Sequence, residues 1–140
     1  MRYKLFFIIL IFFLLNSACK RDERFEFPYV QINLTLGLHS DLGNLGPDQS
    51  VFWAGYGVNG LVIYRSVNDE FSVFDRTCTY ERDYSCFVIE DPSFAGIVEC
   101  PCCQSRYLLM QEGDVLNGPA SHPLVRYMAF IDGGLLRIVN

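Results

Sequence analysis

Short hydrophobic runs separated by turn-forming residues follow one another from residue 30 to residue 139. In the first run, Val30, Ile32, Leu34 and Leu36 alternate with polar residues, the period of two expected of a half-buried strand. Further strands are predicted at 51–54, 61–65, 71–74, 86–89, 96–100, 105–109, 124–131 and 135–139. No window of ten or more residues in this part shows convincing helical periodicity. The pattern predicts an all-β sandwich or barrel.

The first eighteen residues differ from the rest of the chain. Arg2 and Lys4 give a positive start, and residues 5–15 form an unbroken apolar run of eleven residues. A membrane-spanning helix needs about twenty apolar residues. A charged start, a short apolar core and small residues before a cysteine are instead the parts of a secretory signal. We therefore interpret residues 1–18 as a signal peptide and exclude them from the fold.

Residues 15–19, Leu-Asn-Ser-Ala-Cys, resemble the bacterial lipobox, in which the cysteine takes a lipid and becomes the new N-terminus. Asn16 stands where that pattern usually has leucine. The resemblance implies lipidation of Cys19, a tether over residues 19–26 and one domain over residues 27–140. An exported, membrane-anchored lipoprotein of the bacterial cell envelope is then expected. A plain signal peptide or an uncleaved anchor is the alternative, and either also places the domain outside the cytoplasm.

The charge of the predicted mature chain limits its partners. Without Arg2 and Lys4 it keeps 9 basic and 16 acidic side chains, a formal charge of −7. Such a surface repels nucleic acid phosphates and anionic lipid surfaces. No nucleic acid partner is expected, and attachment to a membrane should come from the lipid on Cys19.

Five cysteines of the predicted domain lie within 26 positions: Cys78, Cys86, Cys100, Cys102 and Cys103. Cys100 and Cys103 have the C-x-x-C spacing that places two thiolates on one ion. In an oxidising compartment, disulfides are the default, and each contributes about 2–4 kcal/mol. Thiol–disulfide exchange is a third possibility, but it usually needs a helix N-terminus or a cation beside the thiol. Arg106 is the only nearby cation in sequence, and the residues leave all three possibilities open.

Several motifs around these cysteines occur in a fixed order. Cys-Thr-Tyr occupies 78–80, Cys-Pro-Cys-Cys-Gln-Ser-Arg-Tyr occupies 100–107, Gly-Asp-Val follows at 113–115, and Gly-Pro-Ala-Ser-His-Pro-Leu occupies 118–124. Together they resemble the Rieske iron–sulfur family, whose loops read C-T-H and C-P-x-H-G-S-x-[FY], followed by G-x-V and a closing G-P-A-x-x-P-L loop. The resemblance covers roughly residues 60–139.

The Rieske resemblance refines the expected fold. It implies an antiparallel β-sandwich whose base contains strands from both ends of the domain. A smaller subdomain, about residues 76–122, would carry the cysteine loops.

The resemblance also implies a site, with departures. In a Rieske centre two cysteines bind one iron and two histidines bind the other, one of each from each loop. Cys78 and Cys100 match the cysteines, whereas Tyr80 and Cys103 stand at the histidine positions. A standard two-histidine [2Fe–2S] centre is therefore not expected, and Cys78, Cys100 and Cys103 become the candidate metal ligands. A fourth ligand would come from Cys86, Tyr80 or His122.

Some Rieske proteins carry a disulfide between the two loops, whose second member is the residue between proline and histidine. That residue matches Cys102, and we expect Cys86 as its partner. If no cofactor is bound, Cys78 would form a second bridge with Cys100 or Cys103. The resemblance further places Ser105 and Tyr107 at positions that tune the cluster; without a cluster they would only pack.

Two functions follow from these patterns. By resemblance the chain is an electron-transfer [2Fe–2S] protein with a degenerate ligand set, a redox partner protein and no substrate chemistry of its own. The alternative is a cofactor-free, disulfide-stabilised structural or binding module of the cell envelope. The sequence shows no serine–histidine–acid triad, phosphate-binding loop or paired-acid motif, so the chain is expected to be at most an electron carrier or redox subunit.

Overall fold

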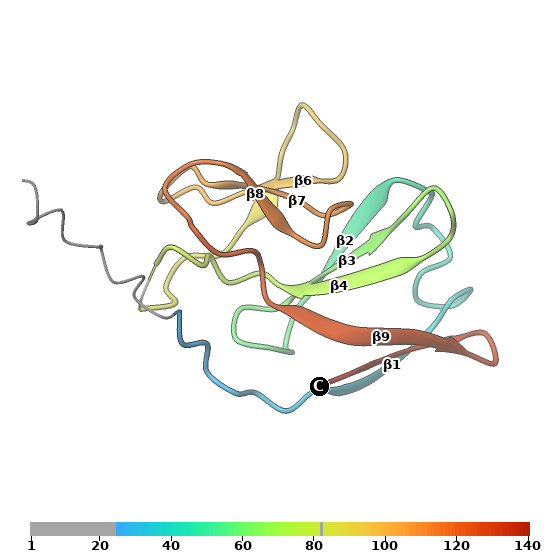
Figure 1. Cartoon of the computed structure of the whole chain (residues 1–140). Coiled ribbons are helices and arrows are strands. Elements are labelled where there is room, and N and C mark those ends of the chain that lie inside the picture. Colours follow the sequence, from blue (N-terminus) through green and yellow to red (C-terminus); the bar gives the residue numbers. More distant parts are fainter. Residues whose placement is uncertain (1–24, 82) are drawn as a thin grey trace, which may run out of the picture.

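The computed structural model describes residues 25–81 and 83–140 (Figure 1). The predicted signal peptide, the Cys19 lipidation site and most of the predicted tether lie outside this part. All regular secondary structure in the described residues is β-strand, and none of them forms a helix able to cross a membrane. The expected all-β class is therefore confirmed.

The strands form two antiparallel sheets. The larger one, here the base sheet, has the order β1 (Asn33–Gly37), β10 (Leu135–Val139), β9 (Arg126–Asp132), β4 (Phe71–Asp75), β3 (Leu61–Arg65), β2 (Gln49–Trp53). The smaller one has the order β5 (Ile89–Glu90), β6 (Ile97–Glu99), β7 (Arg106–Leu108), β8 (Asp114–Asn117). It belongs to residues 76–122, called here the cysteine subdomain, which lies to one side of the base sheet (Figure 1).

The base sheet curls around an aliphatic core. Leu34 of β1 pairs with Ile138 of β10, and both are buried because their strands alternate between core and solvent. The same core contains Leu61 and Ile63 of β3, although three strands separate β3 from β1 in the sheet. Only a curled sheet can bring both ends of this order into one core.

The β3 and β4 strands contribute side chains to two hydrophobic cores, one in each part of the molecule. All four residues from Leu61 to Tyr64 are buried, so neither face of β3 is open to solvent over this stretch. Val62, Tyr64 and Phe74 pack in a second core together with residues of the cysteine subdomain, namely Cys78, Val88, Val98, Cys100, Tyr107, Leu109 and Ala120. The cysteine subdomain is thus seated on the face of β3 and β4 that points away from the aliphatic core.

A buried carboxylate fixes the chain where it leaves β4 for the cysteine subdomain. Asp75 is fully buried and accepts hydrogen bonds from the Val58 N–H at 2.7 Å, the Tyr127 hydroxyl at 2.9 Å, and the N–H and hydroxyl of Thr77 at 2.9 and 2.5 Å. A side chain at Gly57 would collide with this carboxylate, since a Cβ there would lie 2.2 Å from Asp75 Oδ2. These hydrogen-bond donors offset the free-energy cost of removing the Asp75 carboxylate from water.

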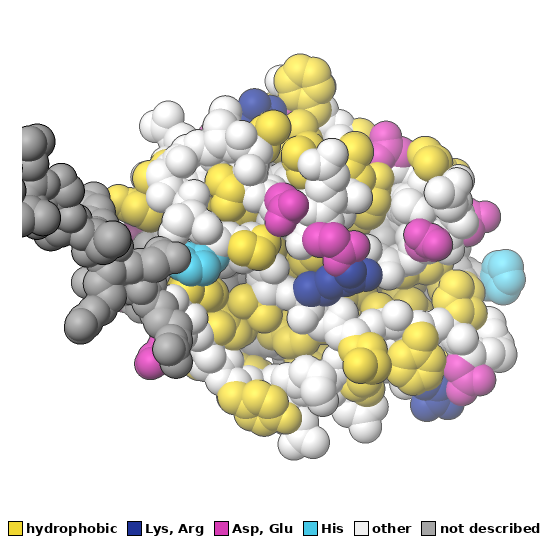
Figure 2. All heavy atoms as spheres, in the orientation of Figure 1, with side chains coloured by type: hydrophobic (Ala, Val, Ile, Leu, Met, Phe, Trp, Pro, Cys, Tyr) yellow, Lys and Arg dark blue, Asp and Glu magenta, His cyan; other side chains and the backbone are white. Residues whose placement is uncertain are grey.

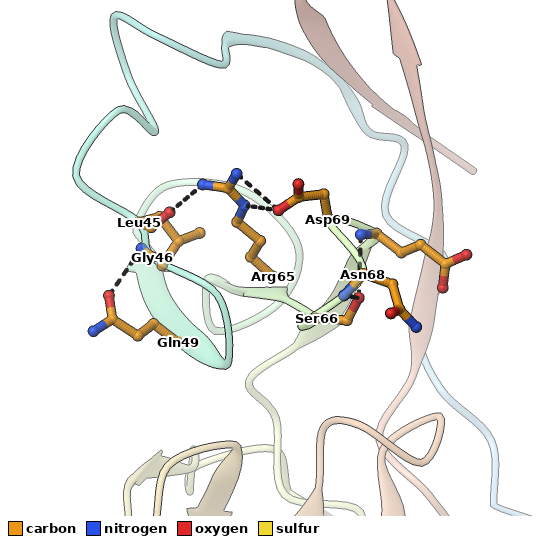
Figure 3. A network of polar contacts seen from close by, with 8 residues as sticks. Leu45, Gly46, Gln49, Arg65, Ser66, Asn68 and Asp69 are labelled. Carbon is orange, nitrogen blue, oxygen red and sulfur yellow. Dashed lines mark hydrogen bonds and ion pairs between the residues drawn. The ribbon is translucent and has the colours of Figure 1, made fainter.

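A second polar network holds the turn between β3 and β4 (Figure 3). Arg65 pairs with Asp69 at 2.8 Å and donates to the Leu45 carbonyl at 2.6 Å. The Ser66 hydroxyl oxygen accepts the N–H groups of Asn68 and Glu70. These contacts tie the turn to the loop that precedes β2.

The prediction and the structure differ most at two elements. The strand expected at 86–89 is reduced to β5, Ile89–Glu90, preceded by an isolated bridge between Thr77 and Phe87. The β8 strand, Asp114–Asn117, was not predicted because only its second residue is half-buried, so its sequence lacks alternation. It forms by pairing with β7, with Val115 opposite Tyr107.

On the surface, hydrophobic side chains are interspersed with carboxylates (Figure 2).

Candidate metal centre

Two loops of the cysteine subdomain carry the free thiols. The first loop follows β4 and contains Cys78, which is fully buried and whose N–H donates to the Cys86 carbonyl at 2.9 Å. The second loop is the turn between β6 and β7. It is closed by hydrogen bonds from the Cys100 N–H to the Ser105 carbonyl and from the Gln104 N–H to the Cys100 carbonyl, both at 2.8 Å.

The two loops bring three thiols together. The sulfur atoms of Cys78, Cys100 and Cys103 all lie within 4.8 Å of one another, and those of Cys78 and Cys103 are 3.5 Å apart. Cys78 and Cys100 are fully buried, and Cys103 is half-buried. Three soft ligands meeting in a buried position form a candidate site for a thiophilic metal ion.

Polar side chains surround the three sulfur atoms. The Tyr107 hydroxyl lies 3.5 Å from Cys78 Sγ, and the Cys103 thiol donates to Ser105 Oγ at 3.1 Å. Tyr107 is held in turn by Thr79, whose Oγ1 lies 3.0 Å from the Tyr107 hydroxyl. The sulfur atoms are therefore oriented by hydrogen bonds as well as by packing.

A third loop, residues 118–124, closes over the thiols. The Ala120 N–H donates to Ser105 Oγ at 3.0 Å, and Thr79 Oγ1 donates to the His122 carbonyl at 2.6 Å. Gly118 makes the close approach possible, since a Cβ there would lie 2.5 Å from the Ser105 Cα, and its φ of +106° suits glycine. Ser105 and Thr79 thus join all three loops.

The pKa values of the Cys100 and Cys103 thiols are shifted in opposite directions by their surroundings. Burial raises the pKa of Cys100 to about 12, against opposing hydrogen bonds from the backbone. Burial also acts to raise the pKa of Cys103, but hydrogen bonds from Ser105, Cys78 and Cys100 outweigh it and hold that pKa below the usual value of a thiol. Cys103 is therefore the more readily ionised of these two.

The remaining two cysteines of the described part form a disulfide. Cys86 of the first loop is bonded to Cys102 of the second, across a sequence separation of 16. Both sulfur atoms are consumed by this bond and are not available as thiolate ligands. The bond also ties the two thiol-bearing loops to each other.

The other two residues considered as ligands, Tyr80 and His122, are less buried than Cys78 and Cys100. The Tyr80 side chain, at the position of the first family histidine, is 49% exposed. The His122 ring stacks on Phe25, with ring centres 5.4 Å apart, and its Nδ1 lies 3.1 Å from Ser121 Oγ. His122 therefore approaches the site through its carbonyl and not through its imidazole.

Sequence reasoning did not single out Thr79 or Asp75. Thr79 bonds to Tyr107 and His122, 28 and 43 positions away, and Asp75 bonds to Tyr127, 52 positions away. No local pattern encodes such partners. The one available signal for Thr79 was its place inside the Cys-Thr-Tyr motif.

Comparisons with known proteins place this geometry in a known fold. No protein-family model matches the chain, and no curated protein matches it in sequence. Among solved structures, it is similar to the cyanobacterial plasma membrane Rieske protein PetC3 from Synechocystis PCC 6803, with a TM-score of 0.59 and 22% identity over 76% of this chain and 99% of that chain. It is also similar to the ferredoxin of carbazole 1,9a-dioxygenase from Nocardioides aromaticivorans IC177, with a TM-score of 0.53 and 14% identity over 79% of this chain and 98% of that chain. The chain therefore has the Rieske-type fold expected from its motifs.

The residues present do not fit the standard Rieske cofactor. That centre needs two imidazoles on its second iron, and the motif resemblance puts Tyr80 and Cys103 at the corresponding positions. The single histidine near the loops, His122, turns its ring onto Phe25. The imidazole pair of a two-histidine [2Fe–2S] centre is therefore not found beside the three thiols among the described residues.

Proposed function

We propose that the protein is an electron carrier of the bacterial cell envelope, whose redox centre is a metal held by the thiols of Cys78, Cys100 and Cys103. The observation that carries the proposal is the meeting of these thiols within 4.8 Å, beneath the closing loop. The fold supports it, because its solved examples include a Rieske protein and a ferredoxin. The chain would have no substrate chemistry of its own.

The surrounding residues suit this role. A metal bound at the thiols would supply the one-electron redox couple. Once the thiols lose their protons, the neighbouring hydroxyls of Ser105 and Tyr107 could donate to the sulfurs, which would withdraw negative charge from them and so favour the reduced state. The closing loop of residues 118–124 would keep bulk water off the buried sulfurs.

The start of the described chain supports a membrane-facing orientation of the cysteine subdomain. Phe25 stacks on His122 of the closing loop, and the Phe27 ring packs edge-on against Tyr84 at 6.1 Å. In Figure 1 this segment begins at the end of the molecule that carries the loops. Six residues after Cys19, Phe25 can lie at most about 22 Å from a lipid on that cysteine.

This geometry supports a proposal about the kind of partner. We infer that the lipid on Cys19 holds the thiol site near the membrane surface, facing a redox partner protein located there. The predicted export signal and lipidation motif support a membrane of the bacterial envelope.

One observation favours the cofactor-free alternative. The Cys86–Cys102 disulfide already ties the two loops together without a metal, and the 3.5 Å between Cys78 and Cys103 would allow a second bridge after a small movement. The protein would then be a structural or binding module held by two cystines, with Cys100 as its remaining thiol.

The test is to purify the mature protein without oxygen from the envelope fraction of its natural host. An absorption spectrum, metal analysis and thiol counting before and after reduction are then compared. Stoichiometric metal with charge-transfer bands that bleach reversibly on reduction supports the electron carrier. A colourless, metal-free protein with two cystines contradicts it and supports the cofactor-free module.

A further inference from the structure

The spacing of the thiols bears on how many metal ions the site can hold. By the Rieske resemblance, Cys78 would bind one iron and Cys103 would stand at a ligand position of the other. The two irons would then have to fit between these sulfurs, with a metal–sulfur bond of about 2.3 Å on each side. The observed separation of 3.5 Å between Cys78 Sγ and Cys103 Sγ is too short for that arrangement.

The same spacing suits a single ion. Thiolates placed tetrahedrally around one ion at about 2.3 Å lie about 3.8 Å apart. The three sulfurs here lie within 4.8 Å of one another, with one pair at 3.5 Å. Shifts below about 1 Å would therefore bring all three into the coordination sphere of one ion.

We propose that Cys78, Cys100 and Cys103 bind one thiophilic metal ion through three thiolates, in place of a two-iron cluster. The inference rests on the proposed function, since it specifies the centre of that same site. As each metal–sulfur bond forms, the thiol releases its proton to solvent. No oxidant or reductant takes part in this step.

Two of the three sulfurs have beside them a hydroxyl group that can donate to a thiolate. The Tyr107 hydroxyl lies 3.5 Å from Cys78 Sγ, and the Ser105 hydroxyl oxygen lies 3.1 Å from Cys103 Sγ. Donors aimed at ligating sulfur stabilise its charge and hold its orientation. These two sulfurs are thus arranged as ligands before any ion arrives.

The described residues offer no fourth protein ligand. Cys86 and Cys102 are consumed in the disulfide, Tyr80 is half exposed, and the His122 ring is stacked on Phe25. The fourth position of a tetrahedral ion would therefore be filled by water or a small exogenous ligand. In zinc proteins, three protein ligands with an open fourth position mark a reactive site and not a purely structural one.

Cobalt(II) alone is a suitable probe, because its thiolate complexes absorb in the near ultraviolet and visible. The full mature protein is titrated with Co²⁺ without oxygen, after mild reduction that leaves the Cys86–Cys102 disulfide intact. We expect saturation at one Co²⁺ per chain and protection of three thiols from alkylation. Cys78→Ser, Cys100→Ser and Cys103→Ser should each weaken binding by more than about tenfold.

A matched control removes the other two cysteines. The Cys86→Ala/Cys102→Ala double variant keeps the three proposed ligands, so its stoichiometry should remain one Co²⁺ per chain. Near-ultraviolet circular dichroism checks that each variant is folded. Cys103→Ser is the most informative single change, because this half-buried position already hydrogen-bonds Ser105 and tolerates a hydroxyl.

The outcomes separate this inference from the proposed function. Two iron atoms and two acid-labile sulfides in the natively purified protein would overturn the single ion but leave the electron carrier. One bound metal that does not change oxidation state would support the single ion and overturn the electron carrier. A metal-free protein that binds no Co²⁺ after reduction would overturn both.

Discussion

The base sheet and the cysteine subdomain are built in different ways. The base sheet has strands of five to seven residues around a core of leucine, isoleucine and valine with one tyrosine. The cysteine subdomain has strands of two to four residues, and its core includes two thiols and a tyrosine. Both parts bury apolar side chains, but the cysteine subdomain adds a disulfide and hydrogen bonds through Ser105 and Thr79.

This difference shows how a site can be placed where regular structure is scarce. The short strands of the cysteine subdomain contribute few ladder hydrogen bonds, so cross-links between loops position the thiols. Regions held in this way open more readily than a packed sheet. We therefore expect the two parts to respond differently to substitutions, and four predictions test that expectation.

The largest effect is expected for Leu136→Ala in the base sheet. Leu136 is fully buried and pairs with Leu36, so the substitution leaves a cavity and should lower the free energy of unfolding by about 3–4 kcal/mol. The loss should appear in the global unfolding transition, because the cysteine subdomain packs on β3 and β4 and loses its support when the base sheet unfolds. Urea denaturation measures the change, with Leu135→Ala at the 37% exposed neighbour as control. Equal losses for the two variants would refute a core packed at Leu136.

A slightly smaller, local effect is expected when the disulfide is removed. The Cys86→Ala/Cys102→Ala variant frees a loop with a sequence separation of 16, and the free energy of unfolding should fall by about 3 kcal/mol. Hydrogen exchange should accelerate in residues 76–122 while β1, β9 and β10 keep their protection. Equal acceleration in both parts would show that they form one cooperative unit.

The contact between Asp75 and Tyr127 lies at the junction of the two parts. Tyr127→Phe removes a donor to a buried carboxylate and should lower the free energy of unfolding by about 2 kcal/mol. Burial, followed by the charge of Asp75 and the hydrogen bond to it, raises the pKa of Tyr127. The protonated Tyr127 therefore contributes its full share of the folding stability below the ordinary tyrosine pKa of about 10. That share is lost as the pH rises above this value.

Stability should accordingly fall at alkaline pH, and Tyr127→Phe should make that fall less steep. Tyr64, whose pKa burial and Asp48 raise to about 12, contributes in the same direction and remains in the variant. Urea midpoints measured across this pH range give the comparison. Tyr29→Phe is the control, since that side chain is 79% exposed. An alkaline fall of unchanged slope in Tyr127→Phe would exclude Tyr127 as its source.

The two parts also differ in how far the sequence alone could predict them. Strong hydrophobic runs predicted β3 and β10 with the bounds that the structure shows, because burial of both faces of β3 and of one face of β10 requires apolar residues there. In the cysteine subdomain β8 was missed, since its pairing with β7 leaves little trace in residues that are mostly exposed. Motif order pointed to Cys78, Cys100 and Cys103 as candidate ligands, and their sulfur atoms lie within 4.8 Å of one another. Local sequence could not indicate the 3.5 Å between Cys78 and Cys103, which depends on the tertiary path of both loops.

The smallest effect is expected for Tyr80→Phe, and it bears most directly on the site. Tyr80 stands where the Rieske pattern has a histidine, but its side chain is 49% exposed, so the free energy of unfolding should change by less than about 0.5 kcal/mol. Co²⁺ affinity should not change. Thr79→Ala provides the contrast, because it removes hydrogen bonds to Tyr107 and His122 and should weaken Co²⁺ binding about tenfold. A tenfold loss in Tyr80→Phe would instead make its phenol a ligand, and the centre would then be one of three thiolates and a phenolate.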